Sequence, residues 1–542
     1  MPDRRSPLAP LGNHVFLTIW LASITSNFGA LIQDVGAAWM MTSISSSKDM
    51  VALVQASNTA PIMFFSLIAG AVADGFNRRR VLLLSQLFLL IVSALLAIFA
   101  FLGHMTPWLL LAFTFLIGCG TAMNNPSWQA SVGDIVGKED VPAAVSLNSV
   151  GYNITRSVGP AIGGFIVAVA GVAAAFAVNA VSYIAMIFAI FRWKPEYPVS
   201  QLPRESLGQA IAAGLRYVSM SPNLMKVMFR GFLFGFAAVS ILSLLPIVAK
   251  DNLNGGPLVF GGLLGAFGVG AIIGALSNGR LREYLSSEQI VRCSFAGFAV
   301  AAAVCGVSTH FWQVAPALVL AGGCWVLSLS LFNTVVQLST PRWVVGRALS
   351  LYQTATFGGM ALGSWIWGVV AENHGVTEAL SISAIVLMVG VAVGFWLAMP
   401  AFATLDLDPL NRFNEPALRL DLRPRSGPVV VQIDYEIRDV DLPEFLRLMV
   451  ERRRIRLRDG ARNWTLMRDL ENPDIWTESY HTATWVEYVR HNQRRTKADA
   501  DTTDRLLALH SGPEKPRVHR MIERQAIPRA NDVFHQVHIE PR

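Results

Sequence analysis

Runs of about twenty apolar residues, separated by short polar segments, recur along the first 400 positions of the chain. Each run is long enough for an α-helix to cross a hydrocarbon core about 30 Å thick. The pattern predicts twelve transmembrane helices, at residues 14–40, 50–73, 80–102, 107–127, 141–170, 173–192, 223–249, 258–279, 289–308, 312–336, 348–371 and 379–400.

A different pattern follows residue 400. Residues 401–428 contain prolines and aspartates and are predicted to be a linker, after which residues 429–437 alternate between apolar and polar positions, as a β-strand does. Helical spacing is found at 442–449, strand alternation at 464–470 and 475–482, helical spacing again near Trp485 and near Leu506, and a last strand near Val518. This β-α-β-β-α-β order predicts a small α+β domain at 429–527 and a short tail at 528–542.

Composition supports two different solvents. The 542 residues are 53% hydrophobic and 15% charged, with a mean hydropathy of +0.44. Residues 1–400 carry 34 charged residues, whereas residues 401–542 carry 47. We therefore expect lipid around the first part and water around the second. The net charge of +7 does not indicate a nucleic-acid partner, because six of these units fall in the short loops of the apolar part.

Basic residues set the orientation. With both termini in the cytoplasm, 17 Lys and Arg residues of the apolar part fall on the cytoplasmic side and only Lys48 and Lys250 fall outside. Short cytoplasmic loops carry such an excess. The sequence therefore predicts a multi-pass membrane protein with both termini cytoplasmic.

The apolar part contains an internal repeat. Residues 70–78 align with residues 274–282 at an offset of 204, and the same offset places residues 144–147 on residues 348–351. Two six-helix halves, at 1–192 and 223–400, are therefore predicted, joined by a cytoplasmic connector at 193–222.

Three motifs resemble the major facilitator superfamily over residues 10–400. The loop Gly70-x-x-x-Asp74-x-x-x-Arg78 is similar to that superfamily's signature loop, and residues 33–42 and 153–160 are similar to the branch of enterobactin exporters, the transmembrane secretion effectors. The resemblance implies an all-α polytopic fold of two six-helix pseudo-repeats that rock around a central substrate site. It implies a secondary active exporter of a small organic molecule, siderophore-like or drug-like, coupled to protons.

A cytoplasmic gate is predicted at the signature loop. Asp74 precedes Arg78 by four residues at a helix end, so the two can form an ion pair that closes this face. The resemblance implies a further partner at the start of the eleventh span, near Arg347, where the helix dipole favours an anion. The alternative is that these basic residues only follow the positive-inside rule and form no gate. In the second half an asparagine replaces the aspartate, so we expect the halves to contribute unequally. The gate candidates are Gly70, Asp74, Arg78, Asn278, Arg282 and Arg347.

Arg156 and Asp34 are the first candidates for substrate and proton binding, and Asn153, Asn148 and Gln33 are the further candidates beside them. Arg156 lies inside the fifth span, where a charge usually faces a cavity or a partner, and Asn148 and Asn153 fall on a broadly shared face with it. It either attracts an anionic group or extends its head to the cytoplasmic surface. Asp34, beside Gln33 in the first span, is either a proton carrier or an ionised residue at the outer mouth. The sequence leaves both alternatives open.

Three further features of the sequence bear on its function. Gly159-Pro160-x-x-Gly163-Gly164 resembles the end of the antiporter motif of the fifth helix, which favours export, although helix packing alone also explains it. The four cysteines lie in apolar stretches without metal-ligand spacing, so no metal or cofactor is expected. No Walker A pattern is present, which argues against ATP-driven pumping.

The C-terminal domain resembles the ferredoxin-like fold of the antibiotic biosynthesis monooxygenase group through its element order and Asp459-Gly460-Ala461-x-x-Trp464. Such domains pair into dimers, which implies a homodimer. Asn463, Trp464, His481 and Trp485 would line a pocket in such a fold. A packing or regulatory module without enzymatic activity is the favoured interpretation.

Alternatives remain at this point. The basic run at residues 452–458 is expected to be a solvated helix face, with contact to anionic lipid as its alternative. An importer or facilitator is the second transport hypothesis. A membrane-anchored sensor or oxygenase-like enzyme, acting through the C-terminal domain, is the hypothesis from a different class.

Overall fold

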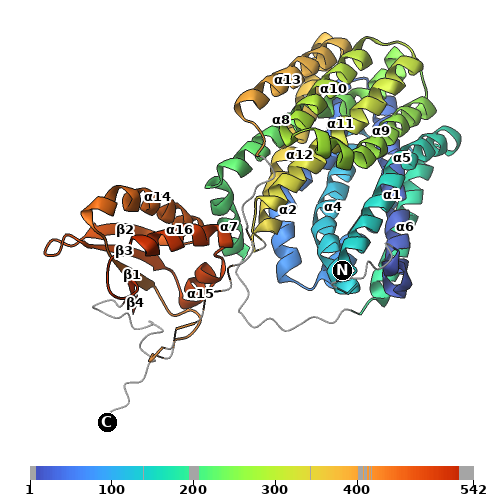
Figure 1. The fold of residues 1–542 in the computed structure, drawn as a ribbon. Helices are drawn as coiled ribbons and strands as arrows, with labels where there is room; N and C mark the ends of the chain where they lie inside the picture. Colours follow the sequence, from blue (N-terminus) through green and yellow to red (C-terminus); the bar gives the residue numbers. More distant parts are fainter. Residues whose placement is uncertain are drawn as a thin grey trace. The chain divides into compact units, whose positions relative to one another are not determined.

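The computed structural model describes residues 8–137, 139–194, 207–341, 343–400, 407, 410, 412–413, 415–416, 418–420 and 422–523. It divides into two compact units, which are described separately. The first contains the long helices, and the second is built on the C-terminal domain (Figure 1). The predicted tail at 528–542 and parts of the connector and linker lie outside the described residues.

The predicted spans all coincide with long helices in the described part of the chain. A short 3-10 turn, η1 (Ala9–Gly12), precedes them. We call the following six helices the first half: α1 (His14–Ile44), α2 (Lys48–Gly75), α3 (Arg78–Phe101), α4 (Pro107–Ile135), α5 (Val141–Ala170) and α6 (Val172–Arg192). After the connector helix α7 (Leu207–Ser219), the second half consists of α8 (Pro222–Ile247) with the π-helical turn η2 (Val248–Asn252), α9 (Pro257–Tyr284), α10 (Ser287–Val307), α11 (Phe311–Leu338), α12 (Val345–His374) and α13 (Val376–Trp396).

The helices at the twelve predicted spans differ in how apolar they are. Eleven helices of the described residues are long and apolar enough to cross a membrane, and α12 is not among them. Although α12 has 30 residues, it mixes apolar positions with glycine, serine, threonine and glutamine. Several of its polar side chains face a cavity inside the bundle, described below, which gives a physical reason for its lower hydropathy.

Local sequence signals explain where the helices begin. The side chain of Asn13 accepts hydrogen bonds from the first backbone N–H groups of α1. Asn77, Thr106 and Ser286 cap α3, α4 and α10 in the same way. These caps satisfy backbone donors that have no partner inside the helix.

The two halves approach each other most closely where α5 crosses α9. A Cβ atom on Gly261 would lie only 2.6 Å from the carbonyl oxygen of Pro160, and one on Gly164 would lie 2.6 Å from that of Pro257. Ser157 Oγ also donates a 2.9 Å hydrogen bond to a backbone carbonyl of α9. Small residues let the helix backbones approach, which is how helices associate in lipid.

The predicted helix-five motif faces two neighbours. Gly159 and Gly163 lie against α1, where added Cβ atoms would meet Leu31 and Ile32 at 3.1 and 3.0 Å. Gly164 faces α9 instead. Each of these glycines therefore allows a close helix contact.

The second unit contains a four-stranded antiparallel sheet at the predicted strand positions. Its strands are β1 (Val429–Glu436), β2 (Arg462–Arg468), β3 (Ile475–Thr482) and β4 (Arg517–Ile522), in the order β2-β3-β1-β4. The helices of this domain are η3 (Asp439–Asp441), α14 (Leu442–Arg458), α15 (Trp485–Gln493) and α16 (Lys497–Leu509). α14 and α16 lie on one face of the sheet (Figure 1), and alternate residues of β1 are buried against them.

The basic run of α14 corrects an expectation. Arg453 and Arg454 are exposed as predicted, but Arg452 and Arg456 are only 5% and 1% exposed. Both buried guanidiniums contact Glu478 of β3, with Nε–oxygen distances of 3.4 and 3.0 Å. Because residues four apart share a helix face, this pair points inward while its neighbours point to water.

Glu478 is the charge on which this core depends. Burial alone would raise the pKa of its carboxyl, but the guanidiniums of Arg456 and Arg452 outweigh burial and hold the pKa at about 2. The carboxylate therefore contributes stability above its usual pKa of 4.5, and this contribution is lost as the pH falls through 2.

Replacing this carboxylate should destabilise the C-terminal domain. Glu478→Gln removes one partner of a buried charge cluster, which costs about 3–5 kcal/mol. We expect faster amide hydrogen exchange in β1 and β3 of the full-length protein at pH 7. Glu471→Gln, at an exposed position, is the control. Equal exchange in the two variants would show that the cluster does not stabilise the sheet.

Enlarging a glycine at the α5–α9 crossing should also destabilise the bundle. Gly261→Val places a side chain where the backbone of α5 lies, whereas Gly279→Val on the same helix meets nothing within 4 Å. We expect the melting temperature of the detergent-solubilised protein to fall for Gly261→Val and to change little for Gly279→Val. If the crossing tolerates valine, the melting temperatures of both variants will equal that of the unaltered protein.

Candidate functional site

A cavity of about 430 Å³ lies between the two halves of the helical unit. Its volume falls in the range of small-molecule sites, about 300–1,000 Å³. Its walls come from α1, α2 and α5 of the first half and from α8, α9, α11 and α12 of the second. The polar and aromatic lining residues are Asp34, Gln55, Tyr152, Arg156, Phe260, Phe267, Trp325, Asn333, Tyr352, Gln353, Thr356 and Phe357.

Asp34 opens onto this cavity from α1. Its side chain is exposed, and Asn58 Nδ2 of α2 donates a long hydrogen bond of 3.4 Å to its Oδ1. Within the part of the chain that the structure describes, no Lys, Arg or His forms an ion pair with it. A small adjoining cavity of about 30 Å³ also contacts Asp34 and Asn58. The carboxylate therefore lies in a confined space without a fixed counter-charge.

Arg156 enters the same cavity from the middle of α5. Its guanidinium carbon lies 5.7 Å from the ring centre of Phe267 and 5.8 Å from that of Trp325. Both rings belong to the second half, so this cation–π contact crosses the interface between the halves. Among the described residues no carboxylate forms an ion pair with Arg156. One acidic and one basic group thus share a single cavity, each without an ion-pair partner there.

Of the amides predicted near these charges, Gln33 and Asn148 do not line the larger cavity, although Gln33 lines the small one beside Asp34. Gln33 is buried, and its Oε1 accepts hydrogen bonds from Ser93 Oγ at 3.0 Å and Asn179 Nδ2 at 2.7 Å. It therefore ties α1 to α3 and α6. Asn148 does not line the cavity of Asp34 and Arg156. The side chain of Asn153 lies outside the described residues.

At the predicted gate of the first half, Arg78 Nη1 forms a 2.9 Å ion pair with Asp134 of α4. The side chain of Asp74 lies outside the described residues. Gly70 packs against α12, where an added Cβ would lie 2.8 Å from Ser350 Oγ. Arg347 lies in the first turn of α12, as the sequence predicts.

In the second half, Asn278 stands at the position that corresponds to Asp74. Arg282 Nε donates a 3.1 Å hydrogen bond to Asn278 Oδ1, and Asn278 Nδ2 donates to Ser330 Oγ of α11 at 3.2 Å. Arg282 is thus bound to a neutral amide at the position that corresponds to Asp74 of the first half.

Three contacts join the two halves at the helix ends far from the N-terminus, in addition to those of Ser66 with Ser350 and Thr354 toward the opposite end. Lys250 Nζ donates to the carbonyl oxygen of Thr42, and the backbone N–H of Lys48 donates to Glu372 Oε2 at 2.6 Å. Trp39 also stacks on Phe260, with ring centres 6.2 Å apart. These contacts join the second half to both α1 and α2 at that end.

The four residues singled out in the C-terminal domain are not brought together around one cavity. Asn463 is exposed on β2, and His481 Nδ1 lies 3.8 Å from Glu523 Oε2. Trp464 donates a 3.1 Å hydrogen bond to Glu478, and Trp485 stacks on Tyr488. The cavity found in this domain has other walls.

Sequence reasoning missed the buried role of Arg230. The positive-inside pattern places Arg230 on the cytoplasmic side, but the side chain is fully buried and its Nη1 lies 3.2 Å from Glu288 Oε1 of α10. Glu288 Oε2 also accepts from the backbone N–H of Met399 at 2.7 Å. A signal existed, since Arg230 lies inside the predicted span 223–249, but its partner is 58 residues away and no local pattern indicates it.

Comparison with known families places this architecture. The sequence profile of the family described as "transmembrane secretion effector" matches residues 5–527. The staphyloferrin A transporter of Staphylococcus aureus is 24% identical over 66% of this chain and 89% of its own length. The multidrug efflux pump Tap of Mycolicibacterium fortuitum is 24% identical over 72% and 97%, and the enterobactin exporter EntS of Escherichia coli is 26% identical over 57% and 74%.

Solved structures show the same fold at lower identity. A bacterial homologue of the human lysosomal transporter Spinster has a TM-score of 0.57 at 14% identity, over 72% of this chain and 97% of its own. A POT family transporter in complex with 5-aminolevulinic acid has a TM-score of 0.58 at 12% identity, over 72% and 96%.

Removing the amide at the centre of the α1–α3–α6 network should destabilise the first half. Asn179→Ala deprives Gln33 of its shorter hydrogen bond, and such interhelical bonds are worth about 0.6–1.7 kcal/mol. We expect a lower melting temperature in detergent than for Asn373→Ala, an exposed position whose amide bonds only within its own helix. The same melting temperature for both variants would contradict this role.

Proposed function

We propose that this chain, which belongs to the transmembrane secretion effector family of the major facilitator superfamily, is a proton-coupled exporter of a small organic molecule. Family membership makes it a multi-pass membrane transporter. The coupling, the direction and the substrate class are the parts that we propose.

The observation that carries the proposal is the pair of charges in one cavity. Asp34 and Arg156 both line the space between the halves, and neither has an ion-pair partner among the described residues. An unpaired carboxylate in a confined space can take up and release a proton. An unpaired guanidinium can bind an anionic substrate group, and the aromatic rings beside it offer a surface for an apolar body.

Contacts between the halves support an alternating-access cycle. Those of Lys250, Lys48 and Trp39 join the halves at the end of the bundle that the positive-inside rule assigns to the outside. The substrate would then enter from the cytoplasm. Rocking of the halves about the α5–α9 crossing would open the outer end. We propose that Asp74, Arg78 and the start of α12 close the cytoplasmic end in that state.

Export is favoured over import by the names of the relatives. Those relatives are called a siderophore transporter, a drug efflux pump and a siderophore exporter. We propose that the cargo is siderophore-like or drug-like, and that the protein resides in the bacterial inner membrane as twelve spans with both termini cytoplasmic. α12 is then a span whose polar residues face the cavity rather than lipid.

The C-terminal strand order β2-β3-β1-β4 agrees with the ferredoxin-like arrangement. We propose that this domain has that fold and pairs two copies of the protein. Deleting residues 411–542 should leave most transport intact if the helical unit is the functional one. Loss of all activity would favour the enzyme or sensor hypothesis.

The direct test compares metabolites inside cells and in their medium, for a strain that lacks the protein and a strain that overproduces it. A compound retained inside the first and enriched outside the second would identify the cargo and establish export. Movement of that compound in the opposite direction would establish uptake instead.

The roles of Asp34 and Arg156 can then be distinguished by measuring transport of that compound in inverted membrane vesicles. Asp34→Asn should abolish accumulation driven by a pH gradient but retain exchange of labelled for unlabelled substrate, because only the proton site is lost. Arg156→Ala should lower both, by about tenfold or more if one charged hydrogen bond to substrate is lost. Glu283→Gln, at an exposed position of α9, is the control. Gradient-driven accumulation in Asp34→Asn would exclude Asp34 as the proton carrier.

A further inference from the structure

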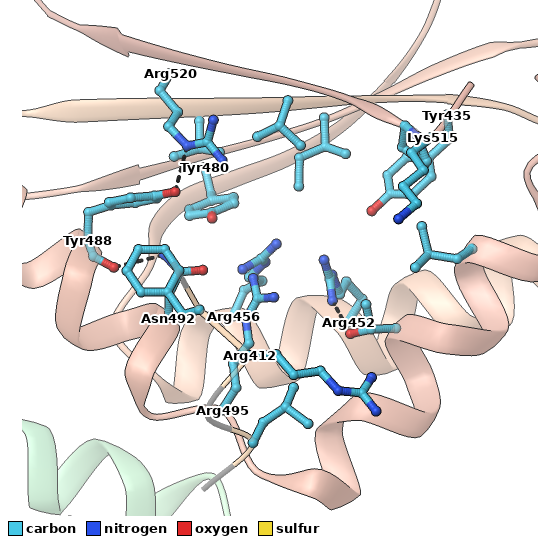
Figure 2. A pocket seen from close by; sticks show the side chains of 18 residues that line it. Arg412, Tyr435, Arg452, Arg456, Tyr480, Tyr488, Asn492, Arg495, Lys515 and Arg520 are labelled. Atoms are coloured by element: carbon cyan, nitrogen blue, oxygen red, sulfur yellow. Dashed lines mark hydrogen bonds between the residues drawn. The ribbon is translucent and has the colours of Figure 1, made fainter. Parts of the chain in front are cut away.

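A second cavity, of about 450 Å³, lies within the C-terminal domain. It opens between the sheet and helices α14, α15 and α16, as Figure 2 shows. We propose that this cavity is a binding site for an organic anion with a flat apolar body. The proposal rests on this cavity alone and does not depend on the transport function.

Positive charge dominates the cavity. Figure 2 shows basic side chains gathered around the space between the strands and the helices. The basic residues that line it are Arg412, Arg452, Arg456, Arg495, Lys515 and Arg520, and no Asp or Glu is among its described lining residues. Such a concentration of cations in one cavity attracts anions.

The carboxylate behind the cavity is already fully used. Glu478 accepts hydrogen bonds from Arg452, Arg456, Trp464 and Tyr435, at distances between 3.0 and 3.4 Å. A carboxylate has about four acceptor positions in total. Glu478 therefore has no acceptor position left for Arg495.

One buried guanidinium nitrogen of the cavity lacks an acceptor, and a neighbouring arginine lacks a carboxylate partner. The Nη2 atom of Arg456 is buried without a hydrogen-bond partner among the described residues, although its Nε and Nη1 are bound to Glu478 and His491. Arg495 has no carboxylate partner in the described part of the chain. Burial, together with the neighbouring Arg456 and Arg452, lowers the pKa of Arg495 to about 10. An anion in the cavity would supply the missing acceptor and relieve this repulsion.

The remaining walls fit a flat apolar body. Val431 and Ile433 of β1 and Val518 of β4 line the side of the sheet. Tyr480 and Tyr488 add aromatic surface, and the Tyr488 hydroxyl accepts a 2.7 Å hydrogen bond from Arg520. Apolar walls with a few convergent polar groups are typical of small-molecule sites. They distinguish this cavity from a site for inorganic phosphate alone.

The segment before the domain closes one side of the cavity. Leu410, Arg412 and Phe413 are among its lining residues. The backbone N–H of Leu410 donates a 2.9 Å hydrogen bond to the carbonyl oxygen of Arg495, and Phe413 contacts the Tyr488 ring at 6.0 Å. A ligand on Arg495 would therefore also touch the chain that leads from α13 into this domain.

The test uses the full-length protein in detergent, with 2-naphthoate as the anionic flat probe, 2-naphthol as its neutral analogue and inorganic phosphate as a bare anion. We expect 2-naphthoate at millimolar concentration to slow amide hydrogen exchange in β1 and α15, and 2-naphthol and phosphate to have much less effect. Protection by phosphate alone would reduce the site to an adventitious ion site. No protection by 2-naphthoate would overturn the proposal.

Arg495→Gln is the decisive variant. It should weaken 2-naphthoate binding about tenfold to a hundredfold, the loss of one charged hydrogen bond. It should also leave the unliganded domain as stable as before or more so, because a repulsive charge is removed. Arg447→Gln, which alters an exposed ion pair with Glu444, should change neither property.

Arg156→Ala separates this cavity from the one in the membrane. Binding that persists in Arg156→Ala but is lost in Arg495→Gln would support the proposal. Binding that depends on Arg156 alone would assign the probe to the transport cavity. Destabilisation of the unliganded domain by Arg495→Gln would give Arg495 a structural role and overturn the proposal.

Discussion

A charge that leaves water needs a compensating partner, and this requirement organises both parts of the molecule. Where the structure supplies the partner, the charge holds elements together. Arg230 and Glu288 connect α8 to α10 in this way, and Glu478 connects β3 to α14. Where the described residues supply no partner, as for Asp34, Arg156 and Arg495, the charge faces a cavity. The sites that we propose are therefore the places where charge compensation among the described residues is incomplete.

The helical unit balances close packing against open space. Glycines let α5 and α9 approach to backbone contact, and residues next to these contacts on the same two helices, Arg156 and Phe267, line the cavity. In the proposed cycle, one interface would provide both a contact about which the halves move and the wall of a binding site. Bulky residues along the whole of α5 would have prevented its close contact with α9. Small residues along the whole of α5 would have left the cavity wall without a charged group.

The sequence predicted elements better than contacts. Twelve helical ranges and four strands were legible because periodicity is a local property, and Asp34 and Arg156 stood out because charges are rare in apolar runs. The inward position of Arg452 and Arg456 was missed, since their partner Glu478 follows 22 residues or more later and on another strand. Gln33 was predicted as a candidate beside Asp34. It lines the small cavity that adjoins Asp34, but its Oε1 is bound to Ser93 and Asn179 in a buried network that no local pattern indicates.

The segment before β1 has a practical consequence for anyone who wishes to isolate the soluble domain. Leu410 and Phe413 form part of its cavity wall, and the backbone N–H groups of Trp485 and Val486 donate to carbonyls of Ser426 and Pro424. A fragment that begins at the first strand would expose apolar surface and leave these donors of α15 without acceptors. The folding boundary therefore lies nearer residue 410, inside what its composition marks as a spacer, and a shorter fragment would be expected to aggregate.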